Sequence, residues 1–185
     1  MVPIPSLWLA ILLSSAIVFV ASFIVWTMMP YHKSDYKPLP DEDAARKALG
    51  GNIPPGSYNI PNVPSRDALK DPTFAAKFAE GPIGFLTILP NGVPNTGKQL
   101  ALWFIYLLAV SGTVAYVASR TLDPGEEYLR VFQVVGTVTW LAYGASHVSE
   151  AVWFGRPWSA ILKQLFDAFI YGSLTAGIFG WLWPA

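Results

Sequence analysis

The stretch SHVSEAVWFGRPWSAILKQLFDAF, residues 146–169, joins two long apolar segments and places ionisable side chains inside both of them. Its GRPW sequence, residues 155–158, brings a glycine and a proline close together, which is typical of a turn. The stretch therefore predicts two antiparallel helices joined by a tight turn. An ionisable group inside such an apolar segment is energetically expensive and usually has a purpose. The groups concerned are His147, Glu150, Lys163 and Asp167.

Outward from this hairpin, the sequence contains four segments that are long and apolar enough to cross a membrane as helices. A helix needs about 20 residues to span a hydrocarbon core of about 30 Å. The first two segments carry no charged residue, and the first stops at Pro30, because proline breaks a helix. The four segments cover residues 7–29, 99–119, about 129–154 and about 159–183.

The composition of the whole chain agrees with an integral membrane protein. Of its 185 residues, 53% are hydrophobic and only 13% are charged, and the mean hydropathy is +0.41, which is too apolar for an ordinary soluble domain. The formal net charge of zero gives no indication of a nucleic-acid partner. The absence of cysteine excludes a disulfide, a thiolate metal site and a cysteine nucleophile.

The first apolar segment is expected to remain in the mature protein as a transmembrane helix. A cleaved signal peptide has a basic start and an apolar core of about 7 to 15 residues. Here the apolar run is 23 residues long, and no Lys or Arg precedes it.

Residues 31–98 differ in composition from the apolar segments on either side of them. They hold ten of the sixteen prolines and fifteen of the 24 Asp, Glu, Lys and Arg residues. We therefore expect a first transmembrane helix within residues 1–30, a soluble insert at 31–98, and transmembrane helices two to four within 99–185. The expected fold class is an all-α integral membrane protein of four transmembrane helices with a small α+β insert between helices 1 and 2.

Within this insert, the sequence predicts two short helices and a strand pair. PLPDEDAARKALGG reads as a helix because Asp41 is a suitable cap at its start and Gly50 ends it. DPTFAAKFAEGP reads as a second helix, with Asp71 as the cap and Pro72 at the first helical position. The stretches SYNI and IGFLTIL are typical of short strands.

The distribution of basic residues predicts the orientation in the membrane. Eight of the twelve Lys and Arg residues fall within 31–98. Because loops rich in Lys and Arg stay in the cytoplasm, the insert is expected to be cytoplasmic. Both chain termini then face the periplasm or the exterior.

If the turn of the hairpin is centred near Arg156, residues equally distant from it lie at equal depth on facing helices. Glu150 then lies opposite Lys163, and His147 lies opposite Asp167, so two pairs of opposite polarity are expected. One interpretation is a polar clamp that holds the hairpin together, since intramembrane polar groups often bind helices to each other. The other is a proton or small-solute pathway in which His147 and Asp167 titrate.

A cofactor site at His147 is a third interpretation of this polar cluster. The imidazole of His147 is a candidate axial ligand of a haem or a chlorin. The other histidine, His32, is expected just beyond the first helix at the membrane interface, so its depth does not match. A metal site of His147, Glu150 and Asp167 lacks a fourth ligand. We therefore do not predict that the main function of the cluster is to bind a cofactor or a metal.

The last apolar segment carries a stripe of small residues that recurs every four positions. Such a stripe lets another helix approach closely. Gly136 and Gly144 form a shorter stripe of the same kind on the preceding segment. The sequence leaves the partner open: helix one or two of the same chain, another copy, or a different protein. The stripe consists of Ala168, Gly172, Ala176 and Gly180.

Three stretches of the chain resemble an uncharacterised family of small four-helix bacterial inner-membrane proteins. They are YHKSDYKPLPDEDA after the first apolar segment, GPIGFLTILPNG before the second, and DAFIYGSLTAGIFGWLWP near the C-terminus. The resemblance extends over essentially the whole chain. It implies a bacterial inner-membrane location and four helices around a cytoplasmic insert, and it implies no activity and no site residues.

No motif in the sequence indicates catalysis, because it contains no phosphate-binding glycine loop, nucleophile elbow or HExxH motif. We expect a non-catalytic structural or accessory subunit of a larger membrane complex. Its partners are then the lipid bilayer and other membrane-protein subunits or further copies of itself. The alternatives are the proton or small-solute pathway, and a redox or photosynthetic component that binds haem or chlorin.

Overall fold

The computed structural model describes residues 1–51 and 53–185, which form two compact units. The helical unit comprises Met1–Tyr36 and Asn95–Ala185, and the insert unit comprises Lys37–Pro94. The insert unit is thus shorter than the predicted insert at 31–98. Residues 31–36 belong to the helical unit because they pack against its last helix, as described below.

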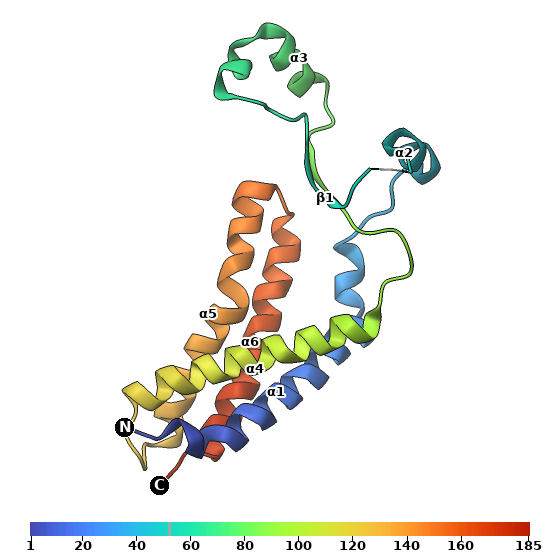
Figure 1. The fold of residues 1–185 in the computed structure, drawn as a ribbon. Coiled ribbons are helices and arrows are strands. Elements are labelled where there is room, and N and C mark those ends of the chain that lie inside the picture. The colour runs from blue at the N-terminus through green and yellow to red at the C-terminus, as the bar shows by residue number, and fades with distance from the viewer. Residues whose placement is uncertain (52) are drawn as a thin grey trace. The chain divides into compact units, whose positions relative to one another are not determined.

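The helical unit is built from four long helical stretches that can be followed in Figure 1. Each stretch begins and ends within a few residues of a predicted apolar segment. The first stretch consists of η1 (Ile4–Leu7), α1 (Trp8–Phe23) and η2 (Ile24–Met28), and the others are α4 (Thr96–Thr121), α5 (Tyr128–Phe154) and α6 (Trp158–Trp181).

Two of these stretches, Ile4–Met28 and Thr96–Thr121, are long and apolar enough to cross a membrane. Helix α6, with 24 residues, extends about 36 Å and is also long enough, but it is less apolar because it contains Lys163 and Asp167. A mostly helical chain with a small insert is therefore confirmed. The membrane-spanning character predicted for all four helices is supported by length and composition for two of them.

Helices α5 and α6 form the predicted antiparallel hairpin. Gly155 ends α5 in the left-handed conformation, with φ of 66°, which glycine adopts without steric penalty. Pro157 directly precedes α6, and Ala160 and Ile161 donate their backbone N–H groups to its carbonyl oxygen. The GRPW sequence is therefore a turn, as its glycine and proline predicted.

The small residues of α6 pack against α5, which was not among the partners that the sequence left open. A Cβ added at Gly172 would lie 3.2 Å from the backbone oxygen of Gly136, and one added at Gly136 would lie 3.3 Å from the Cβ of Ala176. A Cβ at Gly180 would lie 2.7 Å from the ring of Tyr128. The two small-residue stripes thus face each other within one hairpin.

Helices α1 and α4 are joined by hydroxyl groups along their buried faces. The Oγ atoms of Ser14 and Ser15 each lie within 3.2 Å of the Oγ of Ser111. Farther along, the indole N–H of Trp103 donates to the Oγ of Ser22 over 2.9 Å. Interhelical hydrogen bonds of this kind stabilise helix pairs in an apolar environment.

Both chain termini lie with the α4–α5 connection at one end of the helical unit. The backbone N–H of Val2 donates to the carbonyl of Ser119, and that of Gly125 donates to the carbonyl of Pro184. The other end of the unit holds the end of η2 and the α5–α6 turn. The candidate functional site lies toward this second end.

The insert unit contains the two helices and the strand pair that the sequence predicted. The Asp41 carboxylate caps α2 (Glu42–Leu49), and the Asp71 carboxylate caps α3 (Pro72–Glu80). The antiparallel strands are β1 (Gly56–Ile60) and β2 (Gly84–Ile88). A short 3-10 helix, η4 (Arg66–Lys70), precedes α3.

Candidate functional site

A buried ionic network joins α6 to the chain segment that follows α1. This segment contains the 3-10 helix η3 (Pro30–Ser34), which forms because Pro30 stops the preceding helix. The side chain of Asp167 accepts hydrogen bonds from the hydroxyl of Tyr31 and from Nε2 of His32, the latter over 2.8 Å. On the opposite edge of the imidazole, Nδ1 of His32 lies 2.7 Å from Oδ2 of Asp35.

Lys163, one helical turn before Asp167, completes this network. Its ammonium group donates to Oδ1 of Asp35 over 2.5 Å, to the carbonyl of Tyr31 over 2.6 Å and to Oγ of Ser34 over 2.7 Å. Three donor hydrogens therefore meet three acceptors, which is the full hydrogen-bonding capacity of an ammonium group. The four ionisable members, called the ionic network below, are His32, Asp35, Lys163 and Asp167.

The ionic network is almost closed to solvent. The side chains of His32, Asp35 and Asp167 are at most 5% exposed, and that of Lys163 is 22% exposed. The indole of Trp26 stacks on the His32 ring, with centroids 4.1 Å apart and planes within 5° of parallel. The end of η2 therefore covers one face of the histidine.

Each ring nitrogen of His32 lies within hydrogen-bond distance of a carboxylate oxygen. A neutral imidazole has one N–H donor and one acceptor nitrogen, so it can satisfy only one of two ionised carboxylates. An imidazolium donates to Asp35 and to Asp167 at once. The two positive and two negative charges of the ionic network then cancel, which is the condition under which buried charges are tolerated.

Two groups at the ionic network that lie outside the long helices, Asp35 and Tyr31, have shifted pKa values. Burial raises the pKa of Asp35, but the hydrogen bonds from Lys163 and His32 outweigh it and hold the pKa below its ordinary value. For Tyr31, burial together with the hydrogen bond to Asp167 raises the pKa of the phenol. Tyr31 therefore remains a protonated donor, and Asp35 remains a carboxylate.

The predicted pairing across the hairpin is wrong. Lys163 and Asp167 do not pair with Glu150 and His147 but with residues after α1. Depth along two antiparallel helices cannot predict these partners, because they lie on a third segment that folds back against α6.

Glu150 pairs with a residue of the hairpin turn. It forms an ion pair with Arg156, and its other carboxylate oxygen lies 3.6 Å from Nδ1 of His147. The turn thus carries its own acid–base pair, separate from the ionic network.

His147 is held by Gln164, a residue that the sequence analysis did not select. With its amide oriented to suit its neighbours, Gln164 donates to Nδ1 of His147 over 3.1 Å and accepts from the guanidinium of Arg156 over 2.8 Å. Gln164 precedes Asp167 by three residues and so shares its helix face, which was the available signal.

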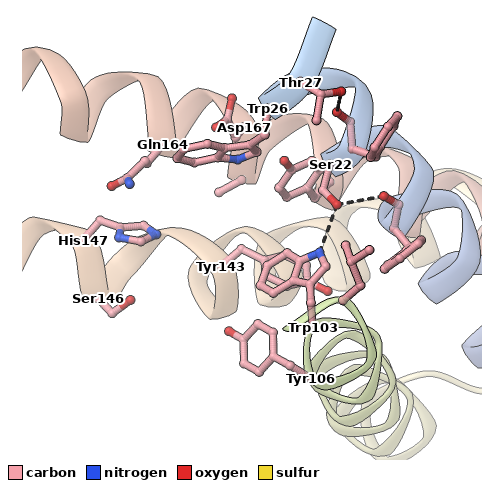
Figure 2. Close-up of a pocket in the computed structure, with 15 residues that line it drawn as sticks. Ser22, Trp26, Thr27, Trp103, Tyr106, Tyr143, Ser146, His147, Gln164 and Asp167 are labelled. Atoms are coloured by element: carbon pink, nitrogen blue, oxygen red, sulfur yellow. Dashed lines mark hydrogen bonds between the residues drawn. The ribbon is translucent and has the colours of Figure 1, made fainter. Parts of the chain in front are cut away.

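A cavity of about 520 Å³ lies beside the ionic network, between all four long helices. Figure 2 shows His147 of α5 and Gln164 and Asp167 of α6 facing the same space. Beyond them the walls are mainly aromatic. The aromatic residues labelled there are Trp26, Trp103, Tyr106 and Tyr143.

His32 lies in η3, just beyond the first helical stretch as expected, but it is buried, with 6% of its surface exposed, and its Nε2 contacts Asp167 of the polar cluster, which was not predicted. The sequence signal for it was YHKSD directly after the helix-stopping proline, with a histidine and an aspartate three residues apart. Both ring nitrogens of His32 face carboxylates, so it cannot also bind haem iron. In the described residues, no group of three His, Cys, Asp or Glu side chains is arranged to hold a metal ion.

The comparisons with known proteins give no relative. No protein-family model, no curated protein and no solved structure matches this chain.

Proposed function

We propose that the chain is a protein of a bacterial inner membrane that crosses it four times and acts as a non-catalytic structural or accessory subunit of a larger membrane complex. The bacterial inner membrane is proposed because three stretches of the chain resemble those of small four-helix proteins of that membrane. The subunit role is supported by the partners of the buried charges. These charges form ion pairs and hydrogen bonds between α6 and the segment that follows α1.

The arrangement of the helices supports four crossings. The hairpin begins beside the end of α4, at the same end as the chain termini, and Lys163 and Asp167 reach η3 at the opposite end. Helices α5 and α6 therefore extend along the same length as Ile4–Met28 and Thr96–Thr121. Lys163 and Asp167 of α6 face the interior of the unit, where partners satisfy them, which makes a lipid environment acceptable for the outer face of that helix.

The observation that carries the subunit role is the closed ionic network. All three donor hydrogens of Lys163 are used within the chain, and both nitrogens of His32 are used as well. Such a network locks the end of the first span to α6. Large apolar side chains on the outer face of the hairpin, at Trp153, Phe166 and Phe169, remain exposed for lipid or for a partner helix.

Purification from the native membrane tests this role. A tagged chain is extracted in mild detergent and analysed by size-exclusion chromatography and mass spectrometry. We expect it to elute well above the mass of its 20.2 kDa monomer, with the same partner polypeptides in a constant ratio. The control is Gly172→Leu, which should stay in the membrane fraction but lose the partners because α5 and α6 no longer pack. A single-copy monomer of the unchanged chain would contradict the subunit role.

A proton pathway is the second candidate, and one observation favours it. Asp167 lines the cavity and contacts His32, which in turn contacts Asp35, so hydrogen-bonding groups continue from the cavity to the segment after α1. A proton can move along such a series. The predicted partner His147 lies across the same cavity but is not part of the series.

Proteoliposomes containing a pH-sensitive dye distinguish the two functions. For a pathway, an imposed pH difference should collapse faster than in empty vesicles, and Asp167→Asn should abolish the effect. Glu127→Gln, at an exposed carboxylate, is the matched control. For a subunit, the unchanged chain and both variants should leak protons at the rate of empty vesicles.

A further inference from the structure

The cavity beside the ionic network has walls of two kinds. One edge is polar and is formed by His147, Gln164 and Asp167, whereas most of the remaining lining is aromatic. Pockets of about 300–1,000 Å³ with apolar walls and a few placed polar groups are typical of small-molecule sites. The cavity of about 520 Å³ falls in this range.

The polar edge presents a hydrogen-bond donor. Nδ1 of His147 accepts the amide N–H of Gln164, so the proton of a neutral imidazole lies on Nε2. In the part of the chain that the structure describes, the interactions of His147 involve Nδ1, and no hydrogen bond to Nε2 is present. Figure 2 shows the ring extending from α5 into the shared space. An occupant therefore needs a hydrogen-bond acceptor at this edge.

The aromatic lining forms a connected series of rings. Trp103 stacks on Tyr106 at a centroid distance of 5.3 Å, Tyr106 meets Tyr143 edge to face at 6.0 Å, and Tyr143 meets Tyr171 at 5.8 Å. Flat aromatic faces favour stacking with another planar ring. A saturated lipid chain can be buried against these walls, but it gains neither ring stacking nor a hydrogen bond from His147.

The walls of the cavity favour an apolar occupant. They include Phe19, Phe23 and Leu100, which lie on the two helices apolar enough to cross a membrane. A lipid-soluble molecule suits such walls better than a charged solute does, because burying an unpaired charge is costly.

We propose that this cavity binds a membrane-soluble quinone, with its ring against the aromatic wall and one carbonyl oxygen accepting the Nε2 proton of His147. The quinone class combines the three required properties: a planar conjugated ring, carbonyl acceptors and solubility in lipid. The inference rests on the membrane location in the proposed function, but it does not require the subunit role.

A binding titration on the full chain in phosphatidylcholine nanodiscs tests this inference. Decylubiquinone should quench the fluorescence of Trp26 and Trp103 in a saturable manner. Decylbenzene, which has a ring and the same tail but no carbonyl, should neither saturate the signal nor compete. His147→Phe keeps a planar side chain and removes the donor, so the affinity should fall about three- to tenfold, the range for one neutral hydrogen bond.

A pair of serine variants on α5 tests the position of the site. Ser146 lines the cavity and is exposed, so Ser146→Phe should fill the space without displacing the core and should abolish saturable binding. Ser149→Phe, at an exposed position outside the cavity, should bind like the unchanged chain. A melting temperature measured for each variant identifies any that misfolds.

Three results would overturn the inference. The first is equal competition by decylbenzene, which means a groove for lipid chains. The second is a Soret absorption band in the purified protein without quinone binding, which means haem at His147. The third is equal binding by the two serine variants. Recovery of the chain in the soluble fraction of the cell would instead contradict the proposed membrane function, on which the quinone inference rests.

Discussion

Asp167 is the residue on which the ionic network depends most. Its carboxylate accepts hydrogen bonds from Tyr31 and His32, so its removal leaves the Tyr31 hydroxyl without this acceptor and His32 with Asp35 as its remaining carboxylate partner. We expect Asp167→Leu to lower the free energy of unfolding by about 3 kcal/mol, as for one member of a buried ion pair. Chemical or thermal unfolding in detergent measures the change, with Glu127→Gln as an exposed control expected within about 0.5 kcal/mol of the unchanged chain.

The double variant His32→Leu/Asp167→Leu separates charge balance from packing. It removes one positive and one negative charge together and leaves the pair of Lys163 and Asp35 intact. Most of the lost stability should return, because replacing a buried ion pair by apolar side chains is often neutral. Additive losses from the two single changes would contradict the view that these charges neutralise each other.

Asp35 makes the stability dependent on pH on the acid side. The native state holds the pKa of Asp35 below its ordinary value of 3.8, so the unfolded chain binds more protons in acid. The stabilisation is complete above that value and is lost as the pH falls through the native pKa. Melting temperatures measured between about pH 6 and pH 2 should show this loss, and Asp35→Asn should lack it. An identical acid profile in both proteins would mean that other carboxylates control the transition.

At the scale of helices, α5 and α6 can approach each other closely because glycines, which have no side chain, lie at their contact. Gly172 and Gly112 are both helical glycines, but a Cβ at Gly172 would approach the backbone of α5 to 3.2 Å, whereas a Cβ at Gly112 meets nothing within 4 Å. Gly172→Ala should therefore destabilise the fold by about 1–3 kcal/mol. Gly112→Ala should stabilise it by up to about 1 kcal/mol, the helix preference of alanine over glycine.

Unfolding experiments on these two alanine variants give the comparison directly. The same substitution chemistry at two helical positions should produce effects of opposite sign. If both changes stabilise the protein, α5 and α6 are farther apart than the glycine contacts indicate. The volume-conserving change Ile178→Leu provides a third reference, expected to cost less than about 1.5 kcal/mol.

The local elements of this chain were predictable because their signals are local. Asp41 and Asp71 cap their helices, and Gly155 ends α5, since each role depends on a few neighbouring residues. The four long helices were predictable because each requires a long apolar run. The partners of Asp167 were not, because Tyr31 and His32 are separated from it by more than 130 residues along the chain. No periodicity within a single helix encodes such a contact.

For the whole molecule, the main question is whether the α5–α6 hairpin crosses the membrane. Because the turn between these helices is tight, either both cross or neither does, and the C-terminus is on the same side in both cases. A label at Ala185 alone cannot distinguish the two topologies, whereas a label at the turn can. The natural absence of cysteine makes single-cysteine labelling straightforward.

Three single-cysteine variants, each treated with a membrane-impermeant maleimide on intact spheroplasts, decide the topology. With four crossings and a cytoplasmic insert, Ala185→Cys should react, while Asp43→Cys in α2 and Trp158→Cys at the turn should react only after the membrane is permeabilised. All three positions are exposed in the protein, so protection reports the membrane and not burial. Reaction of Trp158→Cys on intact spheroplasts, with Asp43→Cys still protected, would place the hairpin outside the membrane. The cavity between the four helices would then open to water, and both the four-span topology and lipid access for a quinone would fail together.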